Sequence, residues 1–140
     1  MQDTMQPNPD GRLDFEALRH AIEHSAPDLM LGFYAEDARL SIVNAHVPHA
    51  PPFEFRGKGE IAKHLHVALG HEASHRVEPD AAVGEGRVRF REACEYADGS
   101  RVVVETTLEL REGRIVRQVD VVASDALTTR QEGGGRGPPP

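Results

Sequence analysis

The sequence predicts an α+β domain in which N-terminal helices pack on one face of a mostly antiparallel sheet. Apolar residues recur at helical spacing in the first half of the chain, up to about residue 70. From His75 onward the segments are short and rich in β-branched residues, and glycine-containing loops of three residues separate the last of them. Helices followed by a meander of hairpins are typical of a sheet that carries its helices on one side.

Three helices are expected in the first half. Asp14 is placed to cap a helix that begins at residue 15, because an aspartate side chain can accept from the free amides of a first turn. A second helix begins near Pro27, since proline is tolerated in a first turn, and carries Leu29, Met30, Phe33 and Tyr34. A strand follows at residues 38–43. The third helix, residues 59–69, has Ile61, Leu65 and Leu69 at a four-residue spacing and ends at Gly70.

Four strands are expected after the helices, at residues 76–83, 87–96, 101–110 and 114–123. If each loop has three residues with its glycine in the left-handed conformation, Tyr96 pairs with Ser100 and Leu110 pairs with Arg114. A two-residue Asp98–Gly99 turn is rejected, because it would mix charged and apolar residues on one face. The chosen register predicts three rows across the last three strands: Cys94, Val102 and Val122; Glu92, Val104 and Asp120; Phe90, Thr106 and Gln118.

The face toward the helices is apolar except for Tyr96 near one end and for its middle, where Glu92, Thr106, Gln118 and Asp120 lie. Polar side chains on a covered face need partners or water. They therefore mark either a wet pocket or a hydrogen-bonded structural cluster. For the pocket, the expected lining residues are Phe90, Thr106, Gln118, Val104, Val122 and Tyr34.

Asp120 and Glu92 are the candidate catalytic pair, because two carboxylates in different environments can divide the acid and base roles. One shared row would separate their backbones by about 9.6 Å. His64 lies on the inward stripe of the third helix, and a histidine beside a carboxylate makes a usable base. The alternative is structural: both carboxylates then only accept hydrogen bonds from their neighbours, and His64 is a half-buried histidine satisfied by one contact.

Charge and composition exclude several classes of partner. The chain has 23 acidic and 16 basic residues and a net charge of −7, which disfavours nucleic acid and anionic membranes. No apolar stretch approaches the ~20 residues of a membrane span. Residues 1–11 are polar and lack the charged-then-apolar pattern of a secretory signal, so a cytoplasmic location is expected. None of the histidines has metal-site spacing, so neither a metal nor another cofactor is expected. Cys94 is the single cysteine and is expected to be buried.

The ends of the chain and the outer face of its last strand lead to two further expectations. Residues 1–12 and the Gly/Pro-rich residues 126–140 are expected to be disordered, which leaves a domain at 13–125. The last strand is apolar on its other face as well, at Ile115, Val119 and Val121. A strand that is apolar on both faces is central or covered by a partner, so a homodimer through this face is expected; coverage by the chain's own ends is the alternative.

Three segments resemble the nuclear transport factor 2-like superfamily, and its SnoaL-like, polyketide cyclase-like branch in particular: LGFYAEDA at 31–38, FRGKGEI at 55–61 and GRIV at 113–116. The resemblance implies a cone-shaped, cystatin-like roll around a pocket for a small apolar molecule, often in a homodimer. The position of the catalytic aspartate of ketosteroid isomerase falls near Ile42 and that of its tyrosine near Leu18, so isomerase chemistry of that kind lacks its groups. A cyclase-like role remains open to Asp120, and a non-catalytic ligand-binding or dimerisation module is the alternative function.

Overall fold

The computed structural model describes residues 13–47, 49–70, 73–84 and 86–123. The two segments expected to be disordered, 1–12 and 126–140, lie outside these residues. Three helices and seven strands form within the described part of the chain, which confirms the α+β class. The helices are α1 (Phe15–Glu23), α2 (Pro27–Leu31) and α3 (Gly57–Gly70). The strands are β1 (Tyr34–Asn44), β2 (Phe53–Arg56), β3 (Ala73–Val77), β4 (Ala82–Val83), β5 (Arg87–Tyr96), β6 (Arg101–Arg111) and β7 (Arg114–Ala123).

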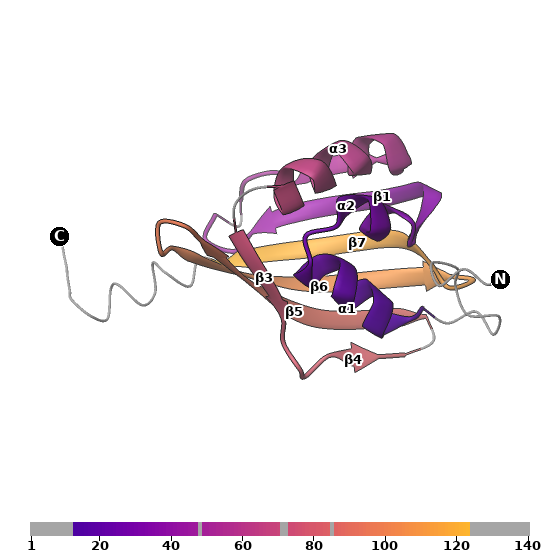
Figure 1. Ribbon diagram of the computed structural model, residues 1–140. Coiled ribbons are helices and arrows are strands. Elements are labelled where there is room, and N and C mark those ends of the chain that lie inside the picture. Colours follow the sequence, from indigo (N-terminus) through magenta and orange to yellow (C-terminus); the bar gives the residue numbers. More distant parts are fainter. Residues whose placement is uncertain (1–12, 48, 71–72, 85, 124–140) are drawn as a thin grey trace.

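The helices lie on one side of the curved sheet, with α3 along β1 and α1 across β5 and β6 in the view of Figure 1. Asp14 caps α1 as expected: its Oδ1 accepts from the amide of Ala17 at 3.1 Å. The α3 stripe that begins with Ile61 and ends with Leu69 is buried against the sheet. No helix of the described residues is long and apolar enough to cross a membrane.

The second helix is shorter than expected. It ends at Leu31, and Tyr34 begins β1 instead of continuing the helix. The cause is tertiary: the carbonyl of Phe33 accepts from the amide of Ile115 at 2.9 Å, and Tyr34 pairs with Ile115 across the sheet. Pairing with a strand about 80 residues away outweighs the helical spacing of this short segment.

The strand order is β2-β1-β7-β6-β5-β3, with β4 also paired to β5. The pairing of β1 with β7 is parallel, and the other pairings are antiparallel. The last strand is therefore an interior strand, because β1 covers the edge that a meander would have left open. The loop before α3 also contains a strand that was not expected, β2, which pairs with β1.

The register of the first hairpin is as expected, and that of the second is wrong by two residues. In the β5–β6 hairpin Tyr96 donates to the carbonyl of Ser100 at 2.9 Å, and Gly99 has a φ of 89°. The β6–β7 turn has only two residues, Glu112 and Gly113, with φ of 53° and 77°. A bulge next to Leu110 then shifts the pairing.

Beyond the bulge, the side chains of β7 still point to the expected faces of the sheet. Each one, however, lies opposite a β6 residue two positions away from its expected partner. Asp120 lies opposite Thr106, and Val122 lies opposite Val104. Asp120 is therefore in the row of Phe90, and Glu92 is in the next row. The bulge also turns Ile115 into the core, where it is fully buried, although it was expected on the outer face.

Candidate functional site

A cavity of about 200 Å³ lies between the helices and the inner face of the sheet. Its apolar wall includes Ile22 and Met30 from the first two helices, Leu65 and Leu69 from α3, and Ile42 from β1. Its polar groups come from the strands and from α3. Eight of the nine residues expected at the site line it: His64, Phe90, Glu92, Val104, Thr106, Gln118, Asp120 and Val122.

Asp120 is the carboxylate at the floor of this cavity. Its Oδ1 accepts from the Thr106 hydroxyl at 3.0 Å and from Gln118 Nε2 at 2.9 Å. No hydrogen bond from a described residue reaches its Oδ2, so this oxygen is available to a molecule in the cavity. The pKa of Asp120 is raised to about 6, mainly by burial. The hydrogen bonds from Gln118 and Thr106 lower the pKa, and the charge of Glu92 raises it.

Tyr34 does not line the cavity, but it holds Gln118, which does. Its hydroxyl is fully buried and donates to Gln118 Oε1. This bond fixes the orientation of the Gln118 amide, so that Nε2 points at Asp120. Burial, followed by the charges of Asp120 and Glu92, raises the pKa of Tyr34 well above its usual value, so the hydroxyl is a donor at any neutral pH.

His64 projects from α3 into the cavity and stacks on Phe55, with ring centroids 4.7 Å apart. Burial lowers the pKa of His64, so the imidazole is neutral at neutral pH. A neutral imidazole has one donor and one acceptor nitrogen. No hydrogen bond from a described residue uses either, which leaves both for a ligand.

The sequence prediction placed Glu92 in the row of Asp120, which is wrong. Glu92 lies one row away and contacts two other residues. Its Oε2 lies 2.8 Å from Nδ1 of His75 and 3.5 Å from Sγ of Cys94. Burial, followed by Glu92, raises the pKa of Cys94, so the thiol stays protonated and is not a nucleophile in this state. Glu92 is therefore part of a three-residue cluster and not the free partner of Asp120.

Sequence reasoning missed His75, which lines the cavity and is buried. The single strand expected at 76–83 is two strands in the structure, β3 at 73–77 and β4 at 82–83, so His75 fell just before the expected start. The available signal was the two-residue alternation that places His75 on the same face as Val77. The helical residues of the cavity wall could not be assigned, because nothing local says which part of the sheet a helix covers.

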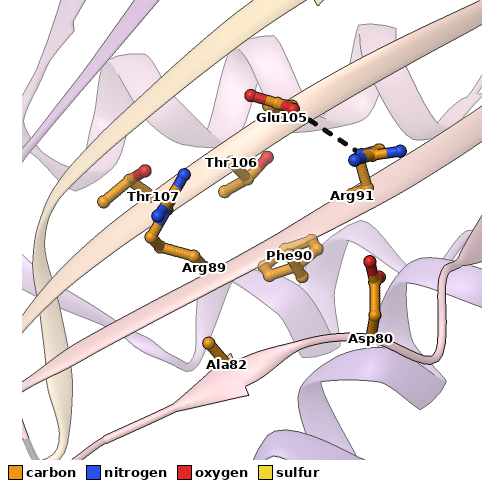
Figure 2. Close-up of a pocket in the computed structure, with 8 residues that line it drawn as sticks. All are labelled: Asp80, Ala82, Arg89, Phe90, Arg91, Glu105, Thr106 and Thr107. Carbon is orange, nitrogen blue, oxygen red and sulfur yellow. Dashed lines mark ion pairs between the residues drawn. The ribbon is translucent and has the colours of Figure 1, made fainter.

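A second hollow, of about 210 Å³, lies beside β4 and is more polar (Figure 2). Phe90 and Thr106 reach it as well as the cavity. Figure 2 shows Arg91 and Glu105 directed toward one another, and their Nε and Oε2 atoms are 3.6 Å apart. Both side chains are half exposed, so water competes for this pair. The cavity with Asp120 is the better candidate, because its polar groups are desolvated and converge.

No protein-family model matches the sequence, and no curated protein matches it. Solved structures do match. One is a nuclear transport factor 2-like protein of unknown function from Mesorhizobium loti, 18% identical, with a TM-score of 0.66 over 78% of this chain and 87% of that chain. Another is a putative ketosteroid isomerase from Kribbella flavida, 14% identical, with a TM-score of 0.63 over 90% and 79%. A third is a putative polyketide cyclase from Sinorhizobium meliloti, 20% identical, with a TM-score of 0.56 over 81% and 94%.

The chain therefore has the nuclear transport factor 2-like fold, and the resemblance found in the sequence is confirmed at that level. Identities of 20% or less show the fold alone. This fold encloses the cavity described above. Some proteins with this fold are named for enzyme activities and others have no assigned function, so the choice between them depends on the groups in the cavity.

Proposed function

We propose that this chain binds a small, largely apolar carbonyl compound in the cavity and transfers a proton on it with Asp120, as an enzyme of the cyclase, isomerase or dehydratase kind. The observation that carries the proposal is the state of Asp120. One of its oxygens is held by Thr106 and Gln118, the other has no partner among the described residues, and its pKa is about 6. A general acid–base group works best with a pKa near the working pH.

The geometry supports a two-step proton transfer. The Asp120 carboxylate removes a proton from the carbon next to the ligand carbonyl; the electron pair of that C–H bond forms a C=C bond, and the π pair of the carbonyl moves to its oxygen, which gives an enolate. The protonated Asp120 then returns the proton to another atom of the ligand. His64 is neutral and faces the same cavity, so it can donate a hydrogen bond to the enolate oxygen.

The size of the cavity limits the ligand. An engineered protein cavity of about 150 Å³ holds benzene, so a space of about 200 Å³ admits one ring with small substituents. A four-ring steroid is larger than this space. We therefore propose a monocyclic or short-chain carbonyl compound as the ligand class.

Deuterium exchange tests the proposal directly. The chain is incubated in D₂O with monocyclic enones and 1,3-diketones, and NMR follows deuterium entry next to the carbonyl. Exchange that is lost in Asp120→Asn and kept in Asp37→Asn, an exposed aspartate paired with Arg111, supports the enzyme. Compounds that raise the melting temperature but never exchange indicate the alternative, a non-catalytic ligand-binding module. If no compound binds or exchanges, the proposal is wrong.

We also propose that the chain forms a homodimer through the outer face of the sheet. Neighbouring strands place half-buried apolar residues together on this face: Val43, Val103, Val119, Val121 and Ala123. Glu105 lies opposite Val121 on the same face and pairs with Arg91. An unpaired charge added among these apolar residues would oppose association, because it would have to be desolvated. Sedimentation of the wild type and of Val121→Glu tests this: a dimer that becomes a monomer supports the interface, and a monomeric wild type overturns it.

A further inference from the structure

We propose that His75, Glu92 and Cys94 form a binding site for a borderline-soft divalent cation of the Zn²⁺ class, in the wall of the cavity. This site was not expected from the sequence, where the three residues have no metal-site spacing. It does not depend on the proposed function, since a cation can bind whether or not Asp120 transfers a proton.

The sheet brings the three side chains to one point. Glu92 and Cys94 are alternate residues of β5 and share its inner face, and His75 on β3 lies directly opposite Cys94 in the pairing. Residues that alternate on one strand and pair across to the next have neighbouring side chains. One ligand atom from each residue lies within 4.8 Å of the other two.

The triangle of ligand atoms is close to one face of a tetrahedral site. Nδ1 of His75 lies 2.8 Å from Oε2 of Glu92 and 3.4 Å from Sγ of Cys94, and the sulfur lies 3.5 Å from the same Oε2. Tetrahedral zinc with bonds of about 2.0–2.3 Å separates its ligand atoms by roughly 3.3–3.8 Å. The two sulfur edges already fit, and the nitrogen–oxygen edge must open by about half an ångström.

The donor set selects the cation. Imidazole nitrogen, thiolate sulfur and carboxylate oxygen are the ligands of zinc, whereas Mg²⁺ and Ca²⁺ take oxygen. Three protein ligands leave a fourth position open, as in catalytic zinc sites. All three residues line the cavity, so a molecule that enters it could meet both the open position and Asp120. Binding must displace the thiol proton of Cys94, so metal uptake releases a proton.

A purely structural hydrogen-bond cluster explains the histidine less well. The side chain of His75 is only 3% exposed, and its Nε2 is buried with no partner among the described residues. A histidine kept for its hydrogen bonds is expected to satisfy both nitrogens when buried. In this structure only Nδ1 of His75 has polar contacts among the described residues, and these are with Glu92 and Cys94.

Cobalt(II) is the probe, because a thiolate bound to it absorbs strongly in the near ultraviolet. The full chain is reduced, freed of metal with a chelator and titrated with Co²⁺. Cys94 is the single cysteine of the chain, so the thiolate band reports this site alone and no surface histidine can produce it. We expect the band to saturate at one equivalent, with visible absorption of tetrahedral intensity, and to disappear when Zn²⁺ is added.

Variants test the ligand set. Cys94→Ser should abolish the band, and Glu92→Gln and His75→Ala should each weaken Co²⁺ binding by about tenfold or more. The control is His66→Ala: His66 forms an exposed pair with Asp28 at 3.0 Å, a place where a cation could bind adventitiously, and its removal should leave the band unchanged. Asp120→Asn should also keep the band, which separates this inference from the proposed function.

Two results would overturn the site. One is the absence of a thiolate–cobalt band in the folded wild type at excess Co²⁺. The other is a band that persists at the same affinity in Glu92→Gln. Thermal melts identify any variant that does not fold; because the wild-type spectrum and the near-isosteric Glu92→Gln each decide the question, the inference does not rest on His75→Ala.

Discussion

The substitution Asp120→Asn is expected to stabilise the folded chain at neutral pH while removing the proposed proton-transfer group. An amide has nearly the shape of a carboxylate. Its oxygen can take the place of Oδ1 and accept from Thr106 and Gln118, which donate at 3.0 and 2.9 Å. Its nitrogen takes the place of Oδ2, toward the cavity. The substitution therefore removes the partly buried charge and keeps the packing.

The magnitude follows from the pKa. Burial raises the pKa of Asp120 from 3.8 to about 6. Because a tenfold change in a proton affinity corresponds to about 1.4 kcal/mol, ionising the partly buried carboxyl group costs at most about 3 kcal/mol. The pKa of Asp120 is higher in the folded than in the unfolded chain. The contribution of protonated Asp120 to the free energy of unfolding is therefore fully present below about pH 4 and is lost as the pH rises through about 6. Asparagine lacks this loss, so the gain in the free energy of unfolding should be about 1–3 kcal/mol at pH 7.5, after allowing for weaker hydrogen bonds to an amide.

Urea unfolding at pH 4.5, 6.0 and 7.5 measures this effect. The difference between the variant and the wild type should grow with pH, because all other groups titrate alike in both proteins. Asp37→Asn is the matched control: this side chain is 75% exposed, and its replacement should change stability by no more than about 0.5 kcal/mol. If Asp120→Asn is less stable than the wild type at pH 7.5, the carboxylate is structural and the reasoning fails.

Three further predictions concern the site and its frame. The rate of deuterium exchange should rise as the pH passes about 6, because the base form of Asp120 is required; a rate that falls over this range contradicts the assignment. Tyr34→Phe should lower the free energy of unfolding in urea by about 1–3 kcal/mol, because it leaves the buried Oε1 of Gln118 without its donor; an unchanged value would show that water replaces the hydroxyl. Glu112→Asn should raise the free energy of unfolding in urea by about 0.5–1 kcal/mol, since Glu112 has a φ of 53° in a two-residue turn that favours Asn-Gly. An unchanged free energy of unfolding would mean that the turn is unstrained.

The register error shows where prediction from sequence stops. The first hairpin could be registered because a single loop with Gly99 sets it. In the second hairpin, the turn and a bulge next to Leu110 act together, and the bulge exists because it lets Leu110 and Ile115 both pack inward. No local pattern distinguishes this arrangement from a longer loop. The error displaced Asp120 by one row without changing its face.

The sequence by itself determined the fold class, the presence of three helices, the inward face of the strands beyond the β7 bulge and eight residues that line the cavity. These follow from periodicities of two and 3.6 residues, which local backbone geometry imposes. Only the tertiary structure decided the parallel pairing of β1 with β7, the support of Gln118 by Tyr34 and the meeting of His75 with Glu92 and Cys94. Such contacts join residues far apart in the chain, and their energies depend on packing, which local spacing does not encode.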